Sequence, residues 1–453
     1  MVDVRSVIEK AASFVPRVQK PIRKVGFGER IVWTAIVLTI FLVMGQVPLY
    51  GIPRESQSFQ ELTIYNIVFA ARRGTLLELG IGPIVTAGLI MQILVGTRII
   101  RLDLTNPSDR ALFTSSQKIL TVIVTMVEAA AAALAYRFVG TTLTIVLVFA
   151  QLFVATLILM LLDELIDKGW GIGSGISLFI AAGVAQHIFW FCFSPAPVRE
   201  GGGPLGVFPA LISYAINGGD IWSVIVGSPK APQLPTLIGF ATMVAMLIAI
   251  IYLESMRVEI PIAYSKYGGL KAKIPLKLLY VSNIPVIFFG VVGANFHLLA
   301  NLTHNPFIIG MSHAFSAPLG FIDTVQRPLH ALAYTLLICS MSGLLALAWV
   351  EASGMSARTQ AENIVKSGLQ IPGFRSSPSV IERYLARYIQ TLTWVSGVIV
   401  GMIAALGDIF GVLGGGIGIL LLIGILYQYY QIMARERALE MYPALKQFLG
   451  VER

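Results

Sequence analysis

Ten apolar runs, each about long enough to cross a bilayer, set the strongest constraint on how this chain of 453 residues folds. A helix that crosses the hydrocarbon core needs about 20 mostly apolar residues. Only 13% of the residues are charged, about half the share of roughly 25% in a soluble domain, so a water-soluble globule could not cover its own surface. The sequence therefore predicts an all-α polytopic membrane protein. The runs are 30–50, 76–97, 117–138, 142–162, 172–192, 235–254, 278–300, 328–350, 389–410 and 413–433.

The basic residues predict the orientation of these spans. An even number of spans places both termini on one side of the membrane. Of the 33 Lys and Arg residues, 26 fall in the N-terminal region, in alternate loops and in the C-terminal tail. Because cytoplasmic loops carry the excess of Lys and Arg, both termini are expected in the cytoplasm.

The spans divide the chain into five predicted regions. The first 29 residues include a cytoplasmic amphipathic helix, because Val4, Val7 and Ile8 fall at helical spacing. Glycines enter both the fifth and the tenth span, which favours two inverted five-span halves, although ordinary helix packing also explains them. The regions are 1–29, the first half 30–192, an external loop 193–234, the second half 235–433 with cytoplasmic loops 255–279 and 351–388, and a cytoplasmic tail 434–453.

One segment between the first two spans does not fit this plan. Residues 61–73 are apolar and compatible with a helix, but they are too short to cross the membrane and end in Arg72 and Arg73. Broken backbone at membrane depth is tolerated only inside protein or beside a water-filled cavity. Two interpretations stay open: an external helix on the bilayer surface, or a short helix folded back into a funnel enclosed by the protein.

The motifs of common enzymes are missing from the sequence. No Gly-Lys pair exists, which excludes a Walker A loop, and no histidine is followed by Glu, which excludes an H-E-x-x-H zinc site. Glu128 is the only acid clearly inside a predicted span, whereas ion-coupled carriers bury paired ionisable groups. We therefore expect no enzyme activity, no cofactor and no metal.

Two cytoplasmic loops carry concentrated positive charge. Loop 255–279 alternates in polarity around Gly268 and Gly269, which predicts a projecting hairpin with basic residues at its tip. Loop 351–388 contains Gly373-Phe374-Arg375 and a further basic run. Such loops either serve only as topology signals or bind a phosphate-rich partner, in which case binding weakens as salt rises.

Four segments resemble the SecY family in its archaeal and eukaryotic form. They are Leu79–Gln92 in span two, Gly173–Gly183 in span five, Tyr280–Ile287 at span seven, and Gly373–Arg375. The resemblance implies an hourglass of two inverted five-helix halves with a re-entrant plug helix and a narrow aliphatic waist. Loop 193–234 and the loop between spans seven and eight carry no match.

The resemblance also implies roles for particular residues. A pore ring at the waist would consist of Ile81, Val85, Ile176, Ile180, Ile287 and Leu421. The plug would be segment 61–75, with Ile64, Ile67, Val68, Phe69, Arg72, Arg73 and Gly74. A lateral gate between spans two, three, seven and eight would carry Thr86, Gln92 and Asn295. Ribosome binding would fall to Lys266, Lys271, Lys273 and Arg375.

The implied activity is that of the central subunit of the Sec protein translocation channel in the cell (plasma) membrane. Such a channel passes unfolded secretory polypeptides and releases transmembrane segments sideways into lipid. The implied partners are a SecE (gamma-type) subunit, a beta-type small subunit, the ribosome, the nascent polypeptide with its signal sequence, and the lipid bilayer. The alternative is a secondary transporter of a small solute built on inverted repeats, which predicts a polar site at the membrane midplane.

Overall fold

Helices occupy all ten predicted runs, so the all-α polytopic architecture is confirmed. The computed structural model describes residues 16–23, 25–52, 70–96, 99–100, 102, 106–135, 141–199, 202–264, 271–281, 283–303, 305–366, 369–370 and 377–441. The helices are α2 (Phe27–Met44), α4 (Gly82–Gly96), α5 (Pro107–Ala135), α6 (Thr142–Leu165), α7 (Gly175–Phe193), α10 (Leu237–Ser255), α11 (Ile284–Thr303), α14 (Pro328–Ala352), α16 (Pro378–Ile409) and α17 (Gly416–Met441).

Within these described ranges, eight of the ten helices are long and apolar enough to cross a membrane. The other two, α4 and α11, supply shorter apolar stretches, Gly82–Val95 and Ile284–His297. At about 1.5 Å per residue, a 15-residue helix such as α4 covers roughly three quarters of a 30 Å hydrocarbon core. These two helices are the ones in which the resemblance places gate residues.

The boundaries of spans one and two differ from the prediction. Helix α2 ends at Met44 rather than at residue 50, because the following turn pairs with residues 74–76. The Leu49 N–H donates to the Gly74 carbonyl (2.9 Å), and the Leu76 N–H donates to the Val47 carbonyl (3.1 Å). The second span begins at Gly82 instead of 76, after turns that include Gly80 with φ +53°. Hydrophobicity alone does not separate a helix from an apolar turn.

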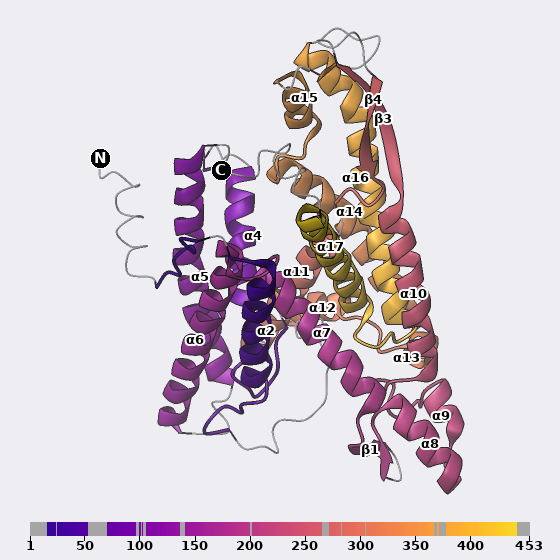
Figure 1. The fold of residues 1–453 in the computed structure, drawn as a ribbon. Coiled ribbons are helices and arrows are strands. Elements are labelled where there is room, and N and C mark those ends of the chain that lie inside the picture. The colour runs from indigo at the N-terminus through magenta and orange to yellow at the C-terminus, as the bar shows by residue number, and fades with distance from the viewer. Residues whose placement is uncertain are drawn as a thin grey trace.

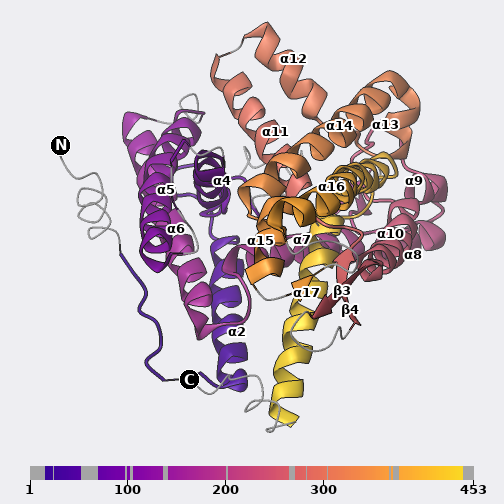
Figure 2. The same cartoon turned by 90° about the horizontal axis from the view of Figure 1, so that it is seen from above.

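The long helices form two groups that meet at the centre of the molecule. Figures 1 and 2 show α2, α4, α5 and α6 on one side and α10, α14 and α16 on the other. Helix α4 contacts both α11 and α14 of the second group, α5 contacts α11, and α7 contacts α17. A single large hydrophobic cluster joins both groups.

One end of the molecule carries the predicted hairpin (Figure 1). Strands β3 (Arg257–Tyr264) and β4 (Lys271–Lys277) pair antiparallel, and β5 (Leu369–Gln370) adds to β3. Helix α15 (Ala357–Lys366) lies at the same end. The hairpin prediction is therefore confirmed, while its turn, 265–270, lies outside the described residues.

The opposite end carries the loop that matched no family segment. It consists of β1 (Pro197–Arg199), β2 (Gly203–Pro204), α8 (Val207–Asn217) and α9 (Ile221–Ile225). Arg199 is 5% exposed and donates to the carbonyls of Leu205 and Pro235, and this burial lowers the pKa of its guanidinium. Helices α12 (Pro306–Phe315) and α13 (Phe321–Gln326) connect α11 to α14, and the π-turn η2 (Ile166–Trp170) links α6 to α7.

Candidate conducting site

The six residues of the predicted ring lie on or directly beside four helices. Ile81 directly precedes α4, Val85 lies on α4, Ile176 and Ile180 lie on α7, Ile287 lies on α11 and Leu421 on α17. Ile81, Ile180 and Leu421 belong to the large central hydrophobic cluster, and the other three are half-buried side chains packed against it. Aliphatic side chains offer no ligand to an ion, and a narrow apolar constriction excludes water.

A buried carboxylate fixes the start of α7, the helix that carries two of the ring residues. Asp163, near the end of α6, is 9% exposed, and its Oδ1 accepts a hydrogen bond from the Ile176 backbone N–H at 2.8 Å. Gly175 permits this approach, because a Cβ there would lie 2.6 Å from Asp163 Cα. The first ring residue of α7 is thus held through its own backbone.

The second half repeats this arrangement at the start of α17. Asp408, near the end of α16, is 7% exposed and accepts a hydrogen bond from the Gly416 N–H at 2.6 Å. Its other oxygen accepts one from the Tyr334 hydroxyl of α14 at 2.8 Å. Sequence reasoning missed both aspartates, although an acid just before each glycine-rich entry was the signal for them.

The described end of the predicted plug lies in the same cluster. Ala70 and Ala71 are buried within it, and Ala70 adjoins Gly183 of α7. Arg72 is half-buried, which lowers the pKa of its guanidinium, and its backbone N–H donates to the Leu77 carbonyl at 2.8 Å. Gly74 is buried and Arg73 is exposed, whereas Ile64, Ile67, Val68 and Phe69 lie outside the described residues.

The predicted gate residues lie on α4 and α11, which touch each other, and no hydrogen bond joins these side chains in the described part of the chain. Thr86 is half-buried, and its Oγ1 has no hydrogen-bond partner among the described residues. Asn295 donates to the Val291 carbonyl of its own helix at 2.8 Å, and Gln92 is half-buried. The seam between α4 and α11 is therefore joined by helix contact rather than by these polar groups.

The predicted docking residues are described only in part. Lys273 lies on β4 with a side chain 67% exposed, and it pairs with Glu259 on β3. Lys271 begins β4. Lys266 and Arg375, like the predicted N-terminal amphipathic helix up to residue 15, lie outside the described residues.

Two cavities lie apart from the ring. One of about 690 Å³ opens among α11, α12, α13, α14 and the turn before α17, where His297, His313 and His330 face it. His297 Nδ1 lies 2.6 Å from the Ser312 hydroxyl, and no group of three potential metal ligands exists in the described part of the chain. Neither cavity is lined by a ring residue.

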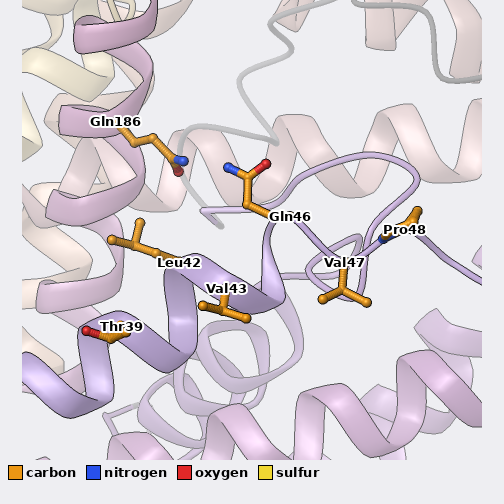
Figure 3. A pocket seen from close by; sticks show the side chains of 7 residues that line it. All are labelled: Thr39, Leu42, Val43, Gln46, Val47, Pro48 and Gln186. Carbon is orange, nitrogen blue, oxygen red and sulfur yellow. The ribbon is translucent and has the colours of Figure 1, made fainter.

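The other cavity, of about 420 Å³, lies between the C-terminal end of α2 and α7. Figure 3 shows Gln46 and Gln186 extending toward one another across it. None of its lining residues is charged, which gives no support to a charged solute site there. They are Thr39, Leu42, Val43, Gln46, Val47, Pro48 and Gln186.

Apolar helices from both halves that meet in one central hydrophobic cluster, with both cavities away from the predicted ring, are the architecture of a polytopic membrane channel. The family described as SecY matches residues 75–430, and the plug domain of Sec61p matches residues 40–74. The chain belongs to the SecY family. The resemblance predicted from the sequence motifs is confirmed.

Individual relatives agree over nearly the whole chain. A protein translocase subunit SecY of Saccharolobus solfataricus is 42% identical, covering 96% of this chain and 97% of the relative. The corresponding protein of Aeropyrum pernix is 40% identical, with 99% of each chain covered. A solved structure described as "The structure of a protein conducting channel" has a TM-score of 0.77 and 35% identity, and covers 97% of this chain and 98% of that one. Sec61 in a canine ribosome-channel complex from the endoplasmic reticulum has a TM-score of 0.74, 35% identity and the same coverage.

Proposed function

We propose that this chain is the pore-forming subunit of a protein translocation channel and that its six ring residues form the seal. The observation that supports the proposal is that Ile81, Ile180 and Leu421, from both halves, share one central hydrophobic cluster, against which Val85, Ile176 and Ile287 pack. Relatives of the chain are named protein translocase subunits, and its structural neighbours include a protein-conducting channel. The chain acts as a channel and not as an enzyme. Its substrate is an unfolded polypeptide, which the flexible aliphatic ring surrounds without offering an ion a binding site.

Sideways release of transmembrane segments follows from the contacts of α4 and α5 with α11 and α14. When this seam opens, the segment in the channel is exposed to lipid. At a helix centre, Leu or Ile gains about 0.3–0.6 kcal/mol, while a charged residue costs about 2.5–3.5 kcal/mol. An apolar stretch of span length therefore leaves through the gate at Thr86, Gln92 and Asn295, and a polar chain continues across. Segment 61–75 acts as the plug that closes the far side of the ring.

The ring is tested by electrical recording. Ile81, Val85, Ile176, Ile180, Ile287 and Leu421 are replaced together by Gly, and the purified protein is reconstituted in planar bilayers. We expect a higher resting ion conductance than in wild type. A control variant with the exposed Val146, Val154 and Ile158 of α6, a helix outside the ring and the gate, changed to Gly accounts for general loosening. Wild-type conductance in the ring variant would exclude the ring.

The orientation, location and partners complete the proposal. The hairpin end and both termini face the cytoplasm of a cell whose plasma membrane holds the chain, in keeping with the distribution of Lys and Arg. Lys266, Lys271, Lys273 and Arg375 bind ribosomal RNA phosphates, as suggested by the ribosome complex of the canine relative. A SecE-type (gamma-type) subunit clamps the two halves, and a beta-type subunit binds at the periphery. Copurification from native membranes tests this assembly, and isolation of the chain without small membrane subunits contradicts it.

A further inference from the structure

Helices α8 and α9, together called the ledge (residues 207–225), have one buried face and one bare apolar face. On the inner face, Val207, Ala210 and Val224 are fully buried and pack with Cys192 of α7. The outer face is made by Ile212, Ile216, Ile221 and Trp222, which are 62%, 77%, 40% and 70% exposed. Ile212 and Ile216 are four residues apart, so they lie on one side of α8.

The ledge is almost without charge. Between Gly201 and Pro229 the sequence contains a single charged residue, Asp220. That carboxylate accepts a hydrogen bond from the Trp222 N–H at 3.1 Å and caps α9. An exposed group of large apolar residues with no basic residue beside it does not attract a charged partner, and it is an unfavourable surface in water.

The apolar outer face continues the surface of a membrane-spanning helix. The last turns of α7 expose Phe189, Trp190 and Phe193 by 64%, 40% and 51%. The Phe193 ring lies 5.5 Å from the ring of Phe208 on α8, measured between centroids. No gap of polar side chains therefore separates the surface of α7 from the ledge.

The position of the ledge turns this surface outward. Figures 1 and 2 both show α8 and α9 at the outer edge of the molecule, far from α4, α5 and α6. Figure 1 shows them below α10, at the end opposite the β3–β4 hairpin. The exposed outer face of the ledge thus lies at the periphery of the molecule, apart from the central hydrophobic cluster.

We propose that the ledge lies in the membrane interface, with Ile212, Ile216 and Ile221 against the acyl chains and Trp222 at headgroup level. Amphipathic helices bury an apolar face about 5–10 Å into this boundary, and Trp is enriched there. The occupant is neutral lipid, because the outer face lacks the Lys and Arg that bind anionic headgroups. The ledge then anchors the end of α7, the helix that carries Ile176 and Ile180.

Site-directed spin labelling of the full chain in phosphatidylcholine vesicles tests this placement. Nitroxides are attached at I216C and W222C in a background of C192S and C339A, and their collision rates with oxygen and with a water-soluble nickel chelate are compared. The matched control is Q233C, at an exposed residue that lines the cavity at the same end. We expect the ratio of oxygen to nickel collisions to be at least threefold higher at 216 and 222 than at 233.

Two results would overturn the proposal. Nickel access at 216 and 222 equal to that at 233 would place the ledge in water, and low access to both reagents would mean that a protein covers it. A second measurement avoids the cysteine-free background: brominated phosphatidylcholine is expected to quench the fluorescence difference between wild type and W222F. An unquenched difference spectrum contradicts lipid contact independently of the spin labels.

Discussion

In both halves of the channel a buried aspartate accepts a backbone hydrogen bond at the start of a helix that carries proposed ring residues, but the proposed gate helices are bonded differently. In the first half two adjacent residues share the capping of one helix and the bond to another. Asp163 caps α7, and Glu164 forms an ion pair with Lys118 of the proposed gate helix α5 at 2.5 Å. In the second half Asp408 does both, since it caps α17 and accepts the Tyr334 hydroxyl of α14.

This difference determines what a single mutation can separate. In the first half the Asp163 cap and the Glu164–Lys118 ion pair can be removed one at a time. In the second half, removal of Asp408 loosens the ring helix and the gate helix together. The halves are thus alike in the position of a buried acid and different in how many contacts depend on it.

The close packing that permits each cap should be the most sensitive feature. A Cβ at Gly416 would overlap the Ala404 carbonyl oxygen, while one at Gly175 would meet Asp163 Cα at 2.6 Å. We expect Gly416→Ala to cost about 3 kcal/mol or more and Gly175→Ala somewhat less, because neither backbone neighbour can move aside cheaply. Thermal unfolding in detergent, followed with a thiol-reactive dye that reaches buried Cys192, measures both. Gly310→Ala is the control, since nothing lies within 4 Å of its added Cβ; equal unfolding temperatures in all three variants would contradict the account.

Loss of the Glu164–Lys118 ion pair in the first half should have the next largest effect on stability. Glu164→Ala leaves the Lys118 ammonium, whose side chain is only 15% exposed, without its partner, and we expect a loss of about 3 kcal/mol. Lys168→Ala is the matched control, because this lysine lies 3.4 Å from the same carboxylate but is 32% exposed. We expect it to cost less than about 1 kcal/mol. If Glu164→Ala and Lys168→Ala unfold at the same temperature, the Lys118–Glu164 pair does not stabilise the first half more than the exposed pair does.

Removal of the two capping aspartates should cost different amounts of stability, because Asp408 accepts a bond from Tyr334 in addition to the capping bond. Asp408→Ala leaves the Gly416 N–H and the Tyr334 hydroxyl without their acceptor, so we expect a loss of about 2–3 kcal/mol of stability. For Asp163→Ala we expect a loss of about 1 kcal/mol. Tyr334→Phe, which removes one of the two bonds, should fall between wild type and Asp408→Ala. A larger loss for Asp163→Ala than for Asp408→Ala would reverse the comparison of the halves.

The smallest effect on stability is expected at the hairpin, which belongs to the second half. Lys273→Ala removes an exposed pair with Glu259 and should change stability by less than about 0.5 kcal/mol. The same variant should bind ribosomes more weakly, and its affinity should depend less steeply on salt than that of wild type. Cosedimentation over a salt series measures this, and Lys230→Ala, at the opposite end, is the control. An unchanged salt slope would show that Lys273 does not contact phosphate.

Some features could be predicted from the sequence because they depend on local pattern. Span-length apolar runs located the ten helices that correspond to the predicted spans, and alternation around Gly268 and Gly269 located the hairpin. The motifs around Leu79–Gln92 and Gly173–Gly183 gave the family. Helix ends were less accurate: α2 ends early because its turn pairs with residues 74–76, a contact between segments that hydrophobicity does not encode.

The sequence by itself determined that this chain enters a membrane, which ten long runs become helices and to which family it belongs, because burial in lipid requires long apolar runs wherever they lie in the fold. Only the tertiary structure decided that Asp163 and Asp408 hold the ring helices and that Tyr334 joins one of these bonds. Those bonds join residues 8 to 74 positions apart, and only the packed helices bring such donors and acceptors within 3 Å.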